Sequence, residues 1–358
     1  MNNGFYTLKI SEVIRETDLA VTLKFNLNAE MKEVFAYKAG QYLTLLANIQ
    51  GEEVRRAYSL CTSPTTDNYI AVTVKAVENG KMSNYVNKEV KTGDEIQVMP
   101  PNGKFFIEAD AAKQRTIILF GGGSGITPLM GIAKTILHSE PLSNIYLVYA
   151  NRSVEDVIFK KELENMEQEN KNRFKIFYSY DKAPMMWFGL KGFLTEKTVG
   201  EILKHKIGIQ SGSAEYFICG PSPMMEVVKN GLKTYGIPEN KVHTEYFAAP
   251  TSSNNSEALE GSPSAFAGES HIKVTLYGKT SEIHTKKNEL ILDAANRAGL
   301  QPPYSCTVGV CTTCRAKVLK GEVKMLEREG LSDAEIAEGY VLTCQSVPMS
   351  ADIELIFE

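Results

Sequence analysis

The sequence of 358 residues has no long uninterrupted apolar segment and no recognisable export signal. Its first stretch, MNNGFYTLKISEV, lacks the basic region, apolar core and cleavage site of a signal peptide. The one run long enough to span a bilayer, residues 116–137, is interrupted by a glycine cluster, by Pro128 and by Lys134. We therefore expect no membrane span, and we expect this run to form a strand, a loop and a helix.

Excess positive charge is absent and histidine is scarce. Lys and Arg number 39 against 43 Asp and Glu, and a net charge of −4 favours neither nucleic acid nor an anionic membrane as a partner. The five histidines are scattered without the spacing of metal ligands or of a nucleophilic triad. Small molecules and proteins are the expected partners.

Three of the six cysteines are clustered within nine positions. Cys306, Cys311 and Cys314 are spaced C-x4-C-x2-C, and Cys344 follows after 29 residues. This is the plant-type 2Fe-2S ligand spacing, in which four thiolates hold two irons. The alternative, a structural zinc site, prefers two C-x2-C pairs. Clustered cysteines without a disulfide framework also predict a reducing, cytoplasmic location.

The pattern of apolar residues changes along the chain and predicts a multidomain fold. Residues 1–108 contain short strand-like runs and predict a small antiparallel β-barrel or sandwich. Residues 109–248 alternate strands with helices and predict an α/β domain with a parallel sheet. Residues 249–269, rich in Ser, Asn, Gly and Pro, predict a flexible linker. Residues 270–358 predict a hairpin, a helix that ends at Gly299 and a last strand.

A glycine-rich turn follows the first predicted strand of the α/β domain. The stretch TIILFGGGSGITPLMGIA carries Gly121, Gly122, Gly123 and Gly125 just before a helix. Such a turn lets backbone amides approach a pyrophosphate at the positive end of the helix. The G-x-G-x-x-G fingerprint is not satisfied, and Arg152 rather than an acid follows the next strand. An arginine there suits a ribose 2′-phosphate, although a solvated strand-tip arginine is an equal alternative.

A barrel followed by this glycine loop resembles the ferredoxin-NADP reductase superfamily. The stretch RAYS matches the flavin motif of that family, which implies that Arg56 binds the FAD pyrophosphate, Tyr58 lies against the isoalloxazine and Ser59 bonds near flavin N5. GKMSNYV, residues 80–86, resembles a second FAD-phosphate segment. CGPSPMM resembles the nicotinamide-side motif, in which Cys219 would sit near the carbon that releases hydride; outside this context a buried packing role would be favoured.

The resemblance implies one set of site residues across the first two domains. Ser59, Tyr58 and Cys219 are implied in catalysis, and Phe247 is implied to cover the other face of the flavin. The implied cofactor-binding residues are Arg56, Tyr58, Ser59, Lys75, Gly80, Lys81, Met82, Ser83, Gly121, Gly122, Gly123, Ser124, Gly125, Thr127, Arg152, Ser153, Ser179, Cys219, Gly220, Pro221 and Phe247. One departure is Tyr180 after Ser179, where many NADP-preferring relatives have arginine.

Residues 270–358 resemble a plant-type ferredoxin domain of the α+β, β-grasp class, with Cys306, Cys311, Cys314 and Cys344 as the implied metal ligands. In layout the chain resembles oxygenase reductase components, such as the phenylacetyl-CoA epoxidase reductase and ketosteroid 9-alpha-hydroxylase reductase group. This implies an oxidoreductase that passes electrons from NADPH or NADH, with a lean to NADPH, through FAD and a 2Fe-2S cluster to an oxygenase component. The alternatives are a general ferredoxin or flavodoxin-type reductase and a redox-sensing module without turnover.

Overall fold

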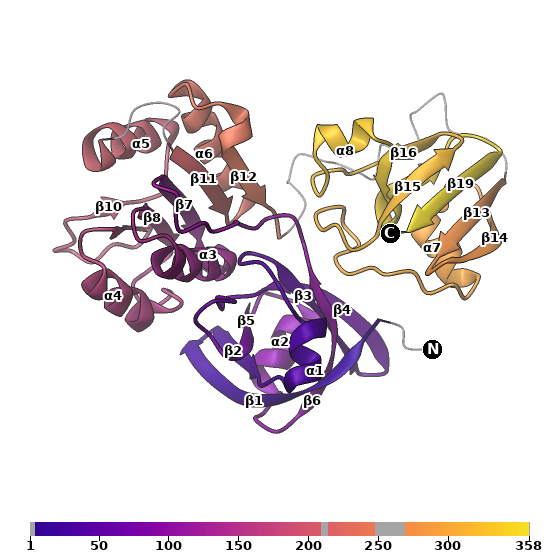
Figure 1. Cartoon of the computed structure of the whole chain (residues 1–358), viewed down its shortest axis with the longest axis horizontal. Coiled ribbons are helices and arrows are strands. Elements are labelled where there is room, and N and C mark those ends of the chain that lie inside the picture. Colours follow the sequence, from indigo (N-terminus) through magenta and orange to yellow (C-terminus); the bar gives the residue numbers. More distant parts are fainter. Residues whose placement is uncertain (1–3, 209–213, 248–268, 358) are drawn as a thin grey trace. The chain divides into compact units, whose positions relative to one another are not determined.

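The computed structural model describes residues 4–208, 214–247 and 269–357 (Figure 1). The chain folds into two compact units. The first comprises Phe5–Glu245, and the second contains Gly4 and the described residues from Tyr246 onward. The predicted linker, residues 249–269, lies outside the described residues except for residue 269. The three-domain boundaries at 108 and 248 stay predictions, since the contacts divide the chain into two units.

A six-stranded antiparallel sheet in the order β4-β3-β6-β1-β2-β5 opens the first unit. A bridge between Leu60, just after β4, and Val72 in β5 brings the two edges together, so the sheet closes as a barrel. Two short helices that the sequence pattern did not predict, α1 and α2, accompany it. The bounds are β1 Tyr6–Thr17, β2 Ala20–Phe25, α1 Ala29–Val34, β3 Tyr42–Ile49, β4 Glu52–Ser59, β5 Ile70–Lys75, α2 Lys81–Lys88 and β6 Glu95–Asn102.

Buried apolar side chains fill the barrel. In β2, which has strands on both sides, residues Ala20–Leu23 and Phe25 are buried, and the interior is filled by β-branched and aromatic side chains. Its core continues into the α/β region, because Phe105 from the end of the barrel meets Phe217 edge to face with ring centroids 5.6 Å apart. Continuous apolar packing of this kind joins the barrel and the α/β region into a single compact unit.

The α/β region is a parallel sheet in the order β10-β9-β8-β7-β11-β12. Figure 1 shows α3 and α4 on one side of this sheet and α5 and α6 on the other. Residues 116–137 form a strand, a loop and most of a helix, as predicted. The bounds are β7 Thr116–Gly122, α3 Ile126–Ser139, β8 Asn144–Asn151, α4 Lys160–Glu169, β9 Phe174–Tyr180, β10 Leu190–Lys191, α5 Glu196–Glu201, the π-helical turn Ile202–Ile207, β11 Ala214–Cys219, α6 Ser222–Thr234 and β12 Val242–Glu245.

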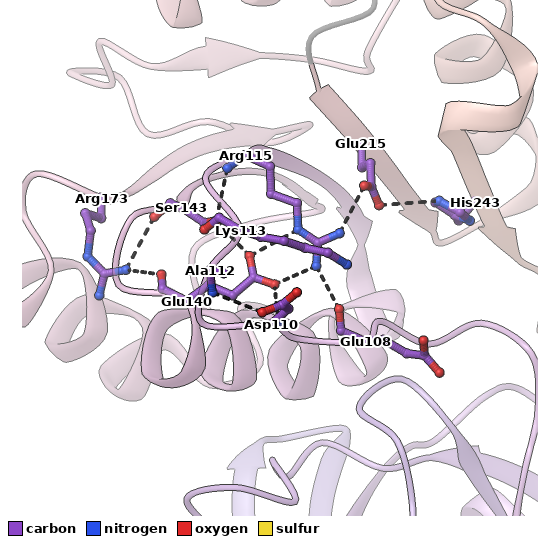
Figure 2. Close-up of polar contacts among 10 residues, drawn as sticks. All are labelled: Glu108, Asp110, Ala112, Lys113, Arg115, Glu140, Ser143, Arg173, Glu215 and His243. Carbon is purple, nitrogen blue, oxygen red and sulfur yellow. Dashed lines mark hydrogen bonds and ion pairs between the residues drawn. The ribbon is translucent and has the colours of Figure 1, made fainter.

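A buried ion-pair network fastens the connector between barrel and sheet (Figure 2). The Arg115 guanidinium donates two hydrogen bonds, of 2.7 and 3.1 Å, to the fully buried carboxylate of Glu140 at the end of α3. It also donates to the Glu108 carbonyl oxygen at 2.9 Å and to the Glu215 carboxylate at 3.0 Å. Its hydrogen bonds with Arg115 and Ser143 hold the pKa of Glu140 below its usual value against the opposing effect of burial. The network joins the connector, α3 and β11 at the edge of the sheet where its strands begin.

The second unit is built on a mixed five-stranded sheet in the order β14-β13-β19-β15-β17, with β16 and β18 as a separate pair. Strands β13 and β19 run parallel, and helix α7 packs its apolar face, including Ile291 and Ala294, on this sheet. The helix was predicted to end at Gly299; it ends at Arg297, and Gly299, with a φ of +79°, comes just after the cap residue Ala298. The bounds are β13 Ser270–Leu276, β14 Lys279–Thr285, α7 Ile291–Arg297, β15 Arg315–Lys320, β16 Val323–Met325, α8 Asp333–Ala337, β17 Tyr340–Leu342, β18 Ser346–Pro348 and β19 Asp352–Phe357.

Candidate active site

The glycine loop lies where strands of the parallel sheet end. Strand β7 ends at Gly122, one tight turn spans Gly123–Gly125, and α3 begins at Ile126. Gly123 has a φ of +52°, which a side chain would disfavour. A methyl group on Gly125 would lie only 2.0 Å from the Cys219 carbonyl oxygen. The glycine at 125 is therefore required by a backbone contact.

That contact belongs to a wider interlock between the glycine loop and the CGPSPMM segment. A methyl group on Gly122 would lie 2.7 Å from Pro221 and from the Met224 sulfur, and one on Gly220 would lie 3.0 Å from Gly122. Two motifs about a hundred residues apart thus pack with their backbones nearly touching. This close packing sets the position of Cys219 relative to the start of α3.

Three polar side chains from distant segments of the first unit meet at this end of the sheet. The Ser59 hydroxyl donates to a carboxyl oxygen of Glu245 at 3.1 Å. Glu245 pairs in register with Cys219 on the neighbouring strand. Burial raises the pKa of Glu245 to about 8, against a smaller lowering by the Ser59 hydrogen bond, and burial also raises the pKa of the Cys219 thiol. Both shifts favour the protonated forms of the two groups. Sequence reasoning missed Glu245.

The remaining flavin-motif residues lie on β4 beside this group. Arg56 is exposed, and its guanidinium donates at 2.7 Å to the Arg55 carbonyl oxygen. Tyr58 is partly buried, and burial raises the pKa of its hydroxyl. Phe247 lies just after Tyr246 at the start of the second unit and keeps 43% of its surface exposed. The flavin contacts of these residues stay predictions.

The second FAD-phosphate segment forms the first turn of α2, with Gly80 as its N-cap. A methyl group on Gly80 would lie 2.4 Å from the Ser83 hydroxyl oxygen and 2.6 Å from the Val77 side chain, so both side chains would have to move to accept it. The Ser83 hydroxyl donates to the Gly80 carbonyl oxygen at 3.4 Å, and the Met82 side chain is buried in the barrel. Lys81 forms an ion pair with Glu52. The first helical hydrogen bond is donated by the backbone amide of Asn84. The backbone amides that precede it in this turn are therefore the groups that could bind a phosphate.

A cavity of about 530 Å³ opens beside the glycine loop. Lys75, at the end of barrel strand β5, and Gly123 contribute to its wall, while Arg152 and Asp181 follow β8 and β9. The full lining is Lys75, Gly122, Gly123, Ala150, Asn151, Arg152, Asp181, Phe193, Leu194, Pro221, Pro223, Met224 and Val227. Neighbouring strands are about 4.8 Å apart, so the ends of β11 and β9 are about 14 Å apart. The wall from Pro221, which follows β11, to Asp181, which follows β9, thus suits a dinucleotide.

Several predicted side chains face their own loops instead of this cavity. The Thr127 hydroxyl donates to the Ser124 carbonyl oxygen at 3.0 Å, the Ser153 hydroxyl to Asp156 at 2.9 Å, and the buried Ser179 hydroxyl to the Gly192 carbonyl oxygen at 2.9 Å. Asp181 is the acid that sequence reasoning did not find, because it follows β9 rather than β8. Burial raises its pKa, partly offset by the nearby Arg152.

In the second unit the four predicted cysteines come together. The thiol of Cys306 interacts with those of Cys311 and Cys344, and the thiol of Cys314 interacts with that of Cys344. Cys344 lies 29 residues beyond Cys314, and the Thr343 hydroxyl, next to Cys344, donates at 2.9 Å to the Cys314 carbonyl oxygen. The fold therefore brings the distant fourth thiol to the three clustered ones.

The surroundings of the cysteines fit an iron-sulfur cluster. The Ser305 hydroxyl, next to Cys306, is buried and has no hydrogen-bond partner, so a donor is available beside the thiols. Gly309, with a φ of +77°, allows the loop to turn close to Glu327 and Gln345. Within residues 4–208, 214–247 and 269–357, no three or more His, Cys, Asp or Glu side chains are arranged to hold a metal ion. The thiol contacts run from Cys311 through Cys306 and Cys344 to Cys314, and their C-x4-C-x2-C spacing with a distant fourth cysteine is the feature that favours two irons over one zinc ion.

Comparisons with known proteins agree with this architecture. Three family models match the chain: "Oxidoreductase FAD-binding domain" over residues 7–107, "Oxidoreductase NAD-binding domain" over 119–230 and "2Fe-2S iron-sulfur cluster binding domain" over 274–349. The chain is 34% identical to a subunit of the 1,2-phenylacetyl-CoA epoxidase of Escherichia coli, covering 99% of this chain and 98% of that protein. It is 31% identical to the "3-ketosteroid-9-alpha-monooxygenase, ferredoxin reductase component" of Rhodococcus rhodochrous, covering 98% and 96%.

The chain belongs to this family of oxygenase reductase components. Its fold agrees with the solved structure of phthalate dioxygenase reductase, with a TM-score of 0.61 and 24% identity over 99% of this chain and 98% of that one. As a member of the family it is an NAD(P)H-dependent oxidoreductase with FAD, a 2Fe-2S cluster and a nicotinamide nucleotide as cofactors. The predicted fold class and family resemblance are thereby confirmed. Among the residues that the structure describes, no helix has both the length and the apolar character needed to cross a bilayer.

Proposed function

We propose that this reductase oxidises NADH and delivers the electrons, one at a time, to the oxygenase component of a multicomponent system. The observation that carries the proposal is the meeting of Ser59, Cys219 and Glu245 at the end of the parallel sheet, beside a cavity sized for a dinucleotide. A protein that only sensed redox state would have no need of such a group.

The cofactors supply the electron chemistry: a flavin accepts a two-electron hydride and releases single electrons, which an iron-sulfur cluster carries onward. The chain's own residues hold and orient them. We assign the FAD phosphates to Arg56 and to the amides at the start of α2, with Tyr58 against the flavin ring and Ser59 near its reacting nitrogen. Cys219, neutral and buried, is assigned to the contact with the nicotinamide.

Glu245 is assigned the role of a proton store. With a pKa raised to about 8 by burial, its carboxyl keeps its proton at neutral pH beside Ser59. In this role the Ser59 hydroxyl turns from Glu245 to give its own proton away and takes the Glu245 proton in its place, so the hydrogen bond between them reverses direction. A carboxylate at this position would place a negative charge next to the nicotinamide contact. The neutral carboxyl can hold a proton for Ser59 and places no negative charge beside the nicotinamide.

Cys306, Cys311, Cys314 and Cys344 are assigned as the cluster ligands, on the support of their mutual contacts. The unpartnered hydroxyl of Ser305 is assigned as a hydrogen-bond donor to the cluster. Hydrogen bonds to cluster sulfurs favour the reduced, more negative state and so raise the potential. We therefore expect Ser305→Ala to lower the reduction potential of the cluster.

The choice of nucleotide rests on two opposed side chains. Arg152 favours a ribose 2′-phosphate, and on that residue alone NADPH would be preferred. Asp181 lines the same cavity and favours a free 2′-hydroxyl, since a carboxylate accepts from a hydroxyl and repels a phosphate. We propose NADH, because Asp181 both neutralises Arg152 and opposes the phosphate.

The electron acceptor is proposed to be an oxygenase component, as the names of the relatives indicate for those proteins. The substrates of those systems, phenylacetyl-CoA, a ketosteroid and glycine betaine, differ, so the acceptor is proposed by class only. A cytoplasmic location is proposed, where NADH is available and thiolate ligands stay reduced. All six cysteines are free thiols in the structure, which supports this.

An anaerobic titration tests the proposal. The purified protein should show flavin bands and a broad iron-sulfur absorption, and NADH should bleach both at lower concentration than NADPH. Cytochrome c should then be reduced over many turnovers. A protein that binds the nucleotide but does not turn over would contradict the proposal, as would one that lacks flavin.

A further inference from the structure

Asn151 presents a buried side-chain amide that is unsatisfied in the structure. The residue ends β8, is 5% exposed and lines the nucleotide cavity. Neither its amide nitrogen nor its amide oxygen has a hydrogen-bond partner. The Tyr149 hydroxyl, which it faces, already gives its proton to the Gly123 carbonyl oxygen at 2.9 Å. An amide left in this state costs stability unless a ligand or a water completes its bonds.

The surroundings of Asn151 place it at the ribose end of the proposed nucleotide site. It precedes Arg152, and its backbone carbonyl oxygen accepts from the amide of Asp181 at 3.1 Å. Cys219, on the other side of β7, lies two strands away. Asn151 is therefore grouped with the two residues that bear on the 2′-position and is separated from the hydride-transfer end.

The chemistry of the amide narrows its partner. An asparagine side chain offers two donor hydrogens and one acceptor oxygen. Each hydroxyl of a ribose diol can both donate and accept, so a diol can satisfy the amide nitrogen and the amide oxygen together. A 2′-phosphate replaces the 2′-hydroxyl with acceptors only and leaves the 3′-hydroxyl as the one donor of this diol, so an amide oxygen placed at the 2′-position would be left without a donor. Sites built to bond a hydroxyl reject ligands that lack it.

We propose that Asn151 recognises the vicinal diol of the adenosine ribose, with its amide oxygen accepting from the 2′-hydroxyl and its amide nitrogen donating to the 3′-hydroxyl, and that it thereby selects against a 2′-phosphate. This inference rests on the proposed function, in that the cavity must hold a nicotinamide dinucleotide. Two residues then select NADH over NADPH. Asp181 repels the 2′-phosphate by charge, and the amide oxygen of Asn151 requires a proton from the 2′-hydroxyl. Arg152 is left to interact with another anionic group of the bound nucleotide.

The test uses the holoprotein and two probes that lack nicotinamide, ADP-ribose and 2′-phospho-ADP-ribose, with affinities measured by calorimetry. Asn151→Ala should weaken ADP-ribose binding by about tenfold or more. It should change 2′-phospho-ADP-ribose binding by less than about threefold, because little is lost where no donor was present. In turnover, KM for NADH should rise in proportion while kcat is retained, as expected when uniform binding is lost. Asn144→Ala, at the opposite end of β8, is the matched control and should leave both affinities unchanged.

Unchanged ADP-ribose binding in Asn151→Ala would overturn the inference, and so would an equal loss for the two probes, which would mean that the side chain only supports the loop. If Asn151→Ala does not retain FAD, the binding measurements are made on Asn151→Asp instead. It keeps the acceptor and adds charge, so the ratio of 2′-phospho-ADP-ribose to ADP-ribose dissociation constants should rise at least about tenfold; an unchanged ratio overturns the inference. If NADH reduces the wild-type protein but the Asn151 variants bind both probes as the wild type does, this inference alone is refuted. If no nicotinamide nucleotide reduces the wild-type protein, the proposed function is refuted.

Discussion

The Ser59 hydroxyl donates a hydrogen bond of 3.1 Å to the partly buried carboxyl of Glu245, which lies 186 residues further along the chain. One residue ends a barrel strand and the other ends the last strand of the parallel sheet. The bond therefore joins the flavin-binding region to the nucleotide-binding region at the point where the hydride is expected to pass.

The raised pKa of Glu245 predicts a pH dependence of flavin reduction. The protonated carboxyl should support the reaction, so the rate of flavin reduction by NADH should fall as pH rises through about 8. Glu245→Gln, which cannot ionise, should remove that step from the profile. Stopped-flow absorbance between pH 6 and 9.5 would measure both, and the exposed Glu239→Gln should keep the wild-type profile. A wild-type rate that does not change across pH 8 would contradict the assignment.

The same group predicts how stability changes with pH. A carboxyl whose pKa is raised in the folded protein binds its proton more tightly there than in the unfolded chain. Its contribution is complete below pH 4.5 and is lost as pH rises through about 8. Urea unfolding at pH 5 and pH 8.5 should show a smaller loss of unfolding free energy in Glu245→Gln than in wild type. Equal losses in the two proteins would count against a buried neutral acid.

The interlock around Gly125 predicts that even a methyl group is not tolerated. Gly125→Ala would place its methyl 2.0 Å from the Cys219 carbonyl oxygen, so the loop must move and both Tm and NADH-dependent turnover should fall. Gly200→Ala, in helix α5, has only Tyr235 nearby at 3.9 Å and should stabilise by about 0.5 kcal/mol. Calorimetry would measure the Tm of the two variants, and steady-state kinetics would measure their turnover. Normal turnover in Gly125→Ala would show that the close approach of Gly125 to Cys219 is not needed for activity.

The cysteine assignment predicts a selective loss of cluster. Cys344→Ser should remove the iron-sulfur absorption and the reduction of cytochrome c, while flavin absorption and NADH-dependent ferricyanide reduction remain. Cys61→Ala, in the barrel, should retain both chromophores. Iron and zinc analysis would accompany the spectra. A colourless second unit with one equivalent of zinc in the wild-type protein would contradict the 2Fe-2S assignment.

Breaking the Arg115 network should destabilise the first unit strongly. Arg115→Met leaves the buried Glu140 carboxylate without its cation and should cost about 3 kcal/mol. Lys197→Met removes a solvent-exposed pair with Glu201 and should have no measurable effect. Because the pKa of Glu140 is lowered, its contribution is present above pH 4.5 and is lost as pH falls, so the difference between Arg115→Met and wild type should shrink in acid. A constant difference down to pH 3 would argue against the pair.

The features of the molecule that depend on local patterns could be predicted from the sequence. The spacing of Cys306, Cys311, Cys314 and Cys344 indicated four ligands, and the structure brings their thiols together. The change from strand runs to alternating strands and helices indicated a barrel and then a parallel sheet. Helices α1 and α2 were missed because stretches of 6 and 8 residues are too short to show helical periodicity.

The features that depend on register and long-range packing could not be read in the same way. Glu245 matters because β12 pairs with β11 and brings it beside Cys219. Asp181 reaches the cavity because Tyr180 pairs with Asn151, so that the residue after β9 neighbours the residue after β8. A search for an acid only after β8 could not find Asp181. For Asn151, nothing in the sequence shows whether a side-chain amide has hydrogen-bond partners in the fold.

The backbone contact between the glycine loop and the Cys219 segment bears on how such reductases can be recombined. A chimera that takes residues 119–130 from one relative and keeps residues 219–225 from another would join surfaces shaped for different neighbours. The two segments fit each other closely in this chain, although about a hundred residues separate them, so they should be exchanged together. Crossover points placed between them should therefore yield inactive hybrids far more often than crossover points in the connector near residue 110.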